Sequence, residues 1–274
     1  IEWTVQAEGA SGDVTEQTCS VQVVRPGKGK KLEDVDFSHL LDFAQFGAGE
    51  GMTSEMILHN PSETRTVNGM IHLMDSEGAP LEVLPHVDGQ ILRAEGDWSA
   101  MPFSIAPMGH FALDASQAQG VRTGSASVRS DGPLAGIVRF TIPGLGTAVL
   151  PGSQPVTEAL ASVRGGAGSH TGAAFRNTEE HPITLRLALR DQQGRPVPGA
   201  EAEVSLEAGA RQARLLDELF GDALPPEFSG ELEIRSQGGS FVAVMLEFGS
   251  QPGSFTALPV TPLLKEEPSD KNQQ

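Results

Sequence analysis

The chain has 274 residues, which is long enough for one large domain or two domains of ordinary size. Its net charge of -17 would repel a phosphate backbone, so we do not expect nucleic acid as a partner. Hydrophobic residues make up 38% of the chain, without an apolar run of ~18 residues, which predicts a soluble protein with no membrane-spanning helix.

The N-terminal region, residues 1–36, is predicted to form a strand-like arm followed by a linker. Residues 3–6 and 19–24 alternate between apolar and polar side chains, as β-strands do. Residues 26–31 are rich in lysine and glycine, which predicts a flexible basic linker. An isolated hairpin is only marginally stable in water, so we expect the arm to add to a sheet edge of its own chain or of a neighbouring subunit.

The rest of the chain is predicted to contain an internal duplication, with one copy in residues 37–156 and the other in residues 157–263. The matched segments are 51–63 with 169–180, 71–80 with 187–196, 103–111 with 204–212, and 124–130 with 230–236. About 100 residues of short strands and turns is the size of an immunoglobulin-like domain. The predicted fold is all-β, with two tandem immunoglobulin-like antiparallel β-sandwich modules. Residues 264–274 are predicted to be a disordered tail.

Apolar residues at every second position of these strands predict the two cores, because successive side chains of a strand point to opposite faces. Only residues 213–220 have the apolar spacing of a helix. The predicted core residues are Leu58, Ile71, Leu73, Ile105, Val128 and Ile137 in the first module, and Phe175, Leu187, Leu189, Leu206, Leu232, Ile234, Val242 and Val244 in the second.

Several motifs resemble those of a known class of modules. Residues 43–51 combine an F-x-x-F start with a glycine-rich bend, and residues 58–62 read Leu-His-Asn-Pro-Ser. With the predicted short helix, they resemble tandem β-sandwich modules of bacterial secreted and cell-surface proteins, over about residues 43–262. The resemblance implies an extracellular sandwich and no particular chemistry. The second module departs from the pattern, since it lacks the F-x-x-F start and has Asn177-Thr178 in place of Asn-Pro.

The sequence contains no motif typical of an active site. A Gly-x-Ser-x-Gly elbow is absent, and the glycine-rich residues 165–168 do not join a strand to a helix, so we interpret them as a bend that opens the second module. No spacing selects a catalytic pair among the 36 acidic residues. We therefore predict that the protein is not an enzyme and has no catalytic residue and no cofactor.

Two features leave a metal site as an alternative. Residues 75–78 and 191–194 each begin with Asp and end with Gly, which predicts a hairpin turn, with a calcium site as the less favoured interpretation. If the strands that carry His59 and His72 form a hairpin, one register places these residues opposite each other, where they could share Zn²⁺ or Cu²⁺. A solvated outer face is the favoured interpretation, so we predict no metal site.

Two single residues suggest further hypotheses, one about sugar binding and one about a thiol. Trp98 lies in a glycine-containing insertion and is the one aromatic side chain that we consider as a platform for a sugar. Cys19 is the only cysteine, and we expect a buried, inert thiol, with a disulfide to another chain as the alternative.

Together these patterns favour a non-catalytic extracellular protein, a building block of a bacterial surface layer, stalk or filament. The alternative is an adhesion module that binds a polysaccharide or a protein. Self-association is expected through sheet edges or the N-terminal arm. Because the chain begins at Ile1 and not at Met, we expect a processed N-terminus and secretion to the cell surface or beyond it.

Overall fold

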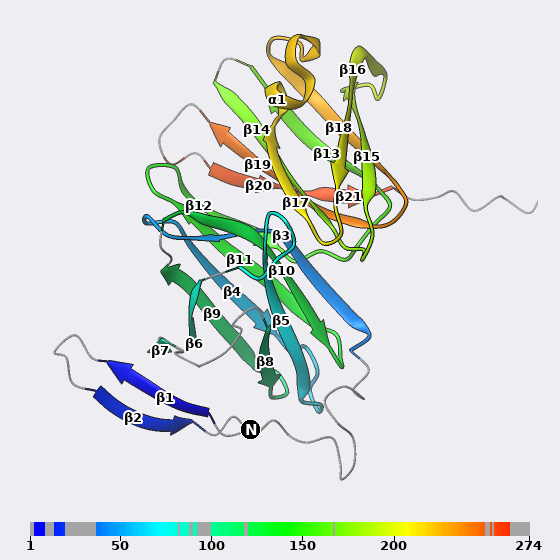
Figure 1. Cartoon of the computed structure of the whole chain (residues 1–274). Helices are drawn as coiled ribbons and strands as arrows, with labels where there is room; N and C mark the ends of the chain where they lie inside the picture. The colour runs from blue at the N-terminus through cyan, green and yellow to red at the C-terminus, as the bar shows by residue number, and fades with distance from the viewer. Residues whose placement is uncertain are drawn as a thin grey trace, which may run out of the picture.

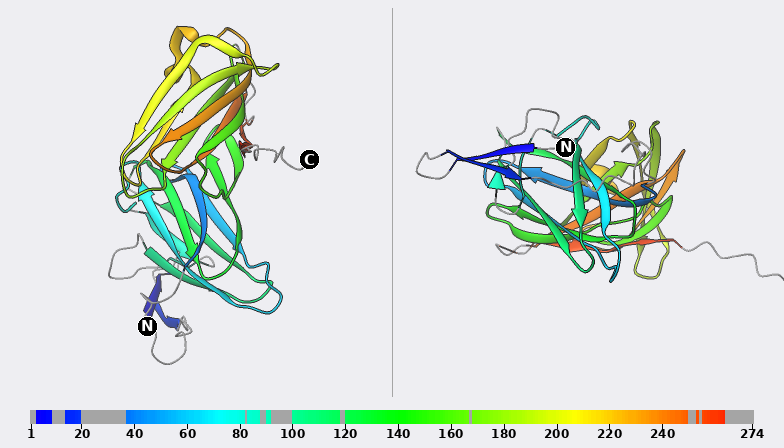
Figure 2. Two further views of the ribbon diagram at one scale, coloured as in Figure 1. Left: turned by 90° about the vertical axis from the view of Figure 1, so that its right-hand side faces the viewer. Right: turned by 90° about the horizontal axis from the view of Figure 1, so that it is seen from below.

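The computed structural model describes residues 3–8, 14–19, 37–81, 83–87, 90–91, 100–117, 120–166, 168–249, 253 and 255–263. Across these ranges the protein is all-β, as predicted, with antiparallel sheets, one short helix α1 (Leu216–Phe220) and a 3-10 turn η2 (Gly221–Ala223). The larger sheets form two units that are stacked along the long axis of the molecule (Figures 1 and 2). We call β3 to β12 the N-terminal unit and β13 to β21 the C-terminal unit.

The N-terminal unit is a sandwich of two sheets, with strand orders β3-β10-β5-β8 and β12-β11-β4-β9-β6-β7. Its strands are β3 (His39–Ala48), β4 (Thr53–His59), β5 (Val67–Asp75), β6 (Leu84–Val87), β7 (Gln90–Ile91), β8 (Ala100–Ile105), β9 (His110–Gln117), β10 (Arg122–Ser130), β11 (Ala135–Ile142) and β12 (Gly146–Pro151). Every second side chain of β4 and β5 is buried, which is the period of a strand with one face on a core.

The C-terminal unit has sheets of order β16-β15-β18-β13-β21 and β17-β14-β19-β20. Its strands are β13 (Glu158–Gly165), β14 (Ser169–Asn177), β15 (Ile183–Asp191), β16 (Pro196–Leu206), β17 (Arg211–Leu215), β18 (Phe228–Gln237), β19 (Phe241–Gly249), β20 (Phe255–Leu258) and β21 (Val260–Pro262). All predicted core residues of the second module are buried.

The strand orders of the two units correspond. The order β3-β10-β5-β8 matches β13-β18-β15-β16, and the order β12-β11-β4-β9 matches β20-β19-β14-β17. The matching strands also follow one another in the same chain order. Among the described elements, β6 and β7 belong to the N-terminal unit alone, whereas α1, η2 and β21 belong to the C-terminal unit alone.

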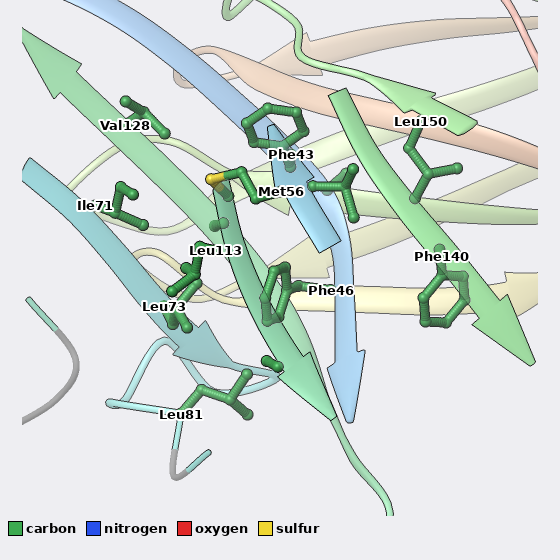
Figure 3. Packing of buried hydrophobic residues seen from close by; sticks show 14 of the residues in the cluster. Phe43, Phe46, Met56, Ile71, Leu73, Leu81, Leu113, Val128, Phe140 and Leu150 are labelled. Carbon is green, nitrogen blue, oxygen red and sulfur yellow. The ribbon is translucent and has the colours of Figure 1, made fainter. Parts of the chain in front are cut away.

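The core of the N-terminal unit joins large apolar side chains from both sheets. Phe43 of β3 and Leu113 of β9 are almost fully buried in this cluster (Figure 3). Of the core residues predicted for this module, only Ile137 is wrong: it is partly exposed, whereas its neighbour Val138 is buried. The reason is the register, which places Val138 opposite the buried Met56, so the inward face of β11 starts one residue later than predicted.

The predicted hairpin between the strands of His59 and His72 does not form. Strand β4 pairs with β11 and β9, while β5 lies in the other sheet and pairs with β10 and β8. His59 therefore lies opposite His110, with ring centroids 6.0 Å apart, and His72 lies opposite Ser127.

The buried Asn60 directly follows β4, where the chain crosses to the second sheet. Its side-chain amide donates to the carbonyl of Arg65 in this connection and to those of Ile105 in β8 and of Ala106.

The N-terminal arm pairs with itself. Strands β1 (Trp3–Glu8) and β2 (Val14–Cys19) form an antiparallel hairpin that is a separate two-stranded sheet. In the described part of the chain it adds to no other sheet, so the expectation that it extends a sheet of its own chain is wrong. Addition to a neighbouring subunit stays a prediction. The predictions for the linker at residues 26–31, for Trp98 and for the tail at residues 264–274 fall outside the described residues.

The predicted helix is shorter than its apolar spacing indicated. The structure has strand β17 up to Leu215, and α1 begins only at Leu216. Ala213 and Arg214 pair with β14 of the same sheet, so the hydrogen bonds of the sheet override the helical pattern there. Glu218 accepts a bond from the backbone N–H of Leu215, which stabilises the start of the helix.

Two glycines lie at corresponding places in the units, and neither has room for a side chain. A Cβ at Gly124 of β10 would overlap the carbonyl oxygen of Met74, and one at Gly230 of β18 would overlap that of Arg190. We expect Gly124→Ala and Gly230→Ala each to lower the free energy of unfolding by about 1–3 kcal/mol in urea denaturation, because the paired strand must move.

Gly172→Ala is the matched control for both variants. It too lies on a strand, but the nearest atom to its added Cβ would be a side-chain carbon of Phe248, 3.2 Å away. Its effect is expected to be well below that of the other two. Equal stabilities for the three variants would contradict the close approach of the backbones.

Candidate functional site

The two units share a buried junction, at which β3 and β12 of the N-terminal unit contact β14, β19 and β20 of the C-terminal unit. Strand β19 is buried on both faces. Phe241 and Met245 belong to the core of the C-terminal unit, whereas Val242, Val244 and Leu246 pack into the cluster of the N-terminal unit. The two valines are thus buried as predicted, but they fill the junction and not the core of their own module.

An ion pair crosses the junction close to this apolar contact. Nη1 of Arg176 on β14 donates to Oδ1 of Asp42 on β3 at 2.5 Å, and both side chains are more than nine-tenths buried. Burial lowers the pKa of Arg176, and the charge of Asp42 acts in the opposite direction. Because the guanidinium of Arg176 and the carboxylate of Asp42 are both shielded from water, each is stabilised mainly by the other.

A second arginine joins the units through neutral partners. Nε of Arg211 donates to the carbonyl oxygen of Ala44 at 2.7 Å, and its Nη2 donates to the side-chain oxygen of Gln45. The backbone N–H of Arg211 donates to the carbonyl of Ser76 at 3.0 Å. Burial lowers the pKa of Arg211 to about 10, so the guanidinium still carries its charge at neutral pH.

A pocket of about 390 Å³ opens beside the ion pair. Its floor is the outer face of β5 and β10, and Arg176 reaches it from the C-terminal unit. The pocket therefore lies mainly on the N-terminal unit, and among the described residues Arg176 is its one lining residue from the C-terminal unit. The lining residues are His72, Leu73, Met74, Gly78, Pro80, Ser127, Arg129 and Arg176.

The pocket carries positive charge in an acidic protein. Arg129 is exposed and makes no ion pair within the described residues, and its charge contributes to lowering the pKa of Arg176. Nε of Arg176 is buried and has no hydrogen-bond partner in the described part of the chain. Asp42 offsets one of the two guanidinium charges, so among these three described side chains about one net positive charge remains. The arrangement suits an anion.

The two acidic turns considered for calcium use their carboxylates to hold the backbone. Oδ1 of Asp75 accepts the N–H groups of Glu77 and Ala79, both at 2.9 Å. Oδ1 of Asp191 accepts those of Gln193 and Arg195 at the same distance. The pKa of Asp191 is lowered, mainly by the hydrogen bonds that the backbone and side chain of Arg195 donate to its carboxylate. These contacts fit the predicted turns.

Other candidates from the sequence do not converge on a site. No three His, Cys, Asp or Glu side chains lie together as possible metal ligands in the part of the chain that the structure describes. His72 lines the junction pocket, while His59 lies on the other sheet next to His110. Within the described ranges, no helix combines the length and the apolarity that crossing a membrane requires.

The site residues that the sequence did not predict are Asp42, Arg129 and Arg176. One signal was present: Arg176 directly follows the core residue Phe175 and precedes a buried asparagine, within a strand of small and apolar residues. No protein family, curated protein or solved structure matches the chain.

Proposed function

We propose that the protein is a non-catalytic, rigid building block of a secreted or cell-surface assembly of bacteria, made of two immunoglobulin-like modules that arose by duplication. The observation that carries the proposal is the junction. A shared apolar cluster, the Asp42–Arg176 pair and the bonds of Arg211 oppose any hinge between the units. Domains whose interface is not extensively apolar usually move relative to each other.

The duplication is supported by a repeated hydroxyl bridge. In the N-terminal unit the hydroxyl of Ser54 accepts from the N–H of Gly47 and donates to its carbonyl, both at 2.8 Å. In the C-terminal unit the hydroxyl of Thr171 makes the same two bonds with Arg164, both at 2.9 Å. The bridges join corresponding strands, so the same device links the same pair of strands twice.

A repeated buried asparagine supports it further. Asn60 and Asn177 each follow the hydroxyl residue of their unit by six positions. Each donates through Nδ2 to three carbonyl oxygens and accepts through Oδ1 the N–H two residues further on. The carbonyls are those of Arg65, Ile105 and Ala106 for Asn60, and those of His181, Leu206 and Glu207 for Asn177. Neither asparagine can be replaced without leaving buried carbonyls unpaired.

Assembly would require subunits to contact each other through sheet edges or through the N-terminal arm. Strands β8 and β16 end their sheets, and edge strands offer unpaired N–H and C=O groups to another strand. The β1–β2 hairpin is a second candidate connector, since it adds to no sheet of its own chain in the described residues. A head-to-tail contact of either kind would give an open filament.

The test compares the full chain with a chain that lacks residues 1–26, by light scattering after size exclusion and by negative-stain microscopy. We expect the full chain to form concentration-dependent oligomers and the truncated chain to stay a folded monomer. Oligomers from both chains would assign the contact to sheet edges. A full chain that stays monomeric up to millimolar concentration would contradict the assembly role, whatever its rigidity.

The alternative, an adhesion module that binds a ligand, is favoured by one observation. The junction pocket presents cationic groups beside apolar walls in a protein of net charge -17. Ligand sites commonly combine apolar walls with a few polar groups and lie where domains meet.

A further inference from the structure

We infer that the junction pocket binds a small organic monoanion, a carboxylate of about monosaccharide size, with its carboxylate between Arg129 and Arg176. This inference does not depend on whether the protein assembles. The volume of about 390 Å³ lies near the lower end of the range for small-molecule sites, which sets the size of the ligand.

The charge of the pocket selects a monoanion. Arg129 contributes a full positive charge, whereas Asp42 already offsets the charge of Arg176 at 2.5 Å. A group with one negative charge balances these described side chains. A dianion such as hydrogen phosphate would place its second charge close to the buried carboxylate of Asp42, where like charges repel strongly because water is excluded.

The donors of the pocket match a carboxylate. A guanidinium presents its N–H groups in a planar fork that fits the two oxygens of a carboxylate. Nε of Arg176, buried and without a partner among the described residues, has a hydrogen-bond capacity that the ion pair leaves unused. Ser127 also lines the pocket; it lies opposite Asp42 in the register and two positions from Arg129, on the same face of β10.

The remaining walls define the body of the ligand. Met74 and Pro80 supply apolar surface that suits the C–H face of a ring, although the sulfur of Met74 also accepts a bond from Nη2 of Arg176 at 3.6 Å. The side chain of Leu73 is buried in the core on the opposite face of β5. Gly78 belongs to a turn that already touches the C-terminal unit, since a Cβ there would meet the carbonyl of Ala208. The ligand thus contacts both units and would hold them together.

The experiment titrates the full chain with D-glucuronate, with its neutral counterpart D-glucose, with acetate and with inorganic phosphate. Backbone amide NMR shifts locate the binding, and calorimetry gives the affinity. We expect saturable binding of glucuronate, weaker binding of acetate and none of glucose, with shifts at the amides of His72, Ser127 and Arg129. The carboxylate contact to Arg129 should be worth about a tenfold to hundredfold gain in affinity.

The variants Arg129→Gln and Arg122→Gln distinguish binding in the pocket from attraction by positive charge elsewhere on the surface. Both arginines are exposed residues of β10, but only Arg129 lines the pocket. Arg129→Gln should weaken glucuronate binding at least about tenfold, by the estimate above, while Arg122→Gln leaves it unchanged. Amide spectra of both variants check that the fold is intact.

Four outcomes would overturn the inference. These are glucose binding as tightly as glucuronate, phosphate binding more tightly than glucuronate, no saturable binding of either carboxylate, and equal affinities of the two variants. Equal binding of glucose would show that charge plays no role, and tighter binding of phosphate would show that the pocket does not prefer a monoanion. The third and the fourth remove the site itself.

Discussion

Replacing Arg176 with methionine should lower the free energy of unfolding by about 3–5 kcal/mol, because the change leaves the carboxylate of Asp42 buried without its partner. Asp42 is 2% exposed, so its carboxylate is poorly solvated. Methionine keeps most of the volume of the side chain, and the loss therefore reports mainly on charge. Equilibrium urea denaturation followed by circular dichroism measures it.

Two further variants make the comparison specific. Arg186→Met removes an arginine from an exposed ion pair with Glu203 on the same unit, and it should cost less than about 1 kcal/mol. The double variant Asp42→Leu with Arg176→Met should recover most of the lost stability, since no charge is then left unpaired. If Arg176→Met were no more harmful than Arg186→Met, the junction would be hydrated and the argument for its rigidity would fail.

Leu189→Ala should cost about 2–5 kcal/mol, because Leu189 is fully buried in the core of the C-terminal unit. It lies on β15 opposite the fully buried Leu232 of β18. Leu145→Ala removes the same atoms from a side chain that is 40% exposed. That control should change the stability by no more than about 0.5 kcal/mol. Similar losses in both variants would place Leu189 outside a closed core.

The sequence predicted the sheet faces well because a strand has a fixed period of two. Leu187 and Leu189 of β15 were assigned inward from this period alone, and both are buried. The period gives a face but not the partner that covers it. Val242 and Val244 were therefore correctly predicted as buried, yet the structure places them against the N-terminal unit. Nothing in a single strand distinguishes its own core from a neighbouring one.

Strand pairing was predicted less well, for a related reason. The hairpin between His59 and His72 assumed that consecutive strands are neighbours, whereas in a sandwich the chain often passes from one sheet to the other. Asp42 and Arg176 are 134 positions apart, so their pairing depends on the docking of complete units. From the sequence alone, a charged residue next to a core position, such as Arg176, is expected to face solvent. Its burial depends on contact with the other unit.

The burial of β19 on both faces has a consequence for synthesis on the ribosome. The N-terminal unit emerges first, and its apolar junction surface has no cover until β19 and β20 have been made. Phe140 contacts Phe255, with ring centroids 6.2 Å apart, although more than a hundred residues are translated between them. Exposed apolar surface on a folding intermediate promotes aggregation, so we expect the nascent chain to aggregate most readily, and to depend most on chaperones, just before β19 and β20 appear.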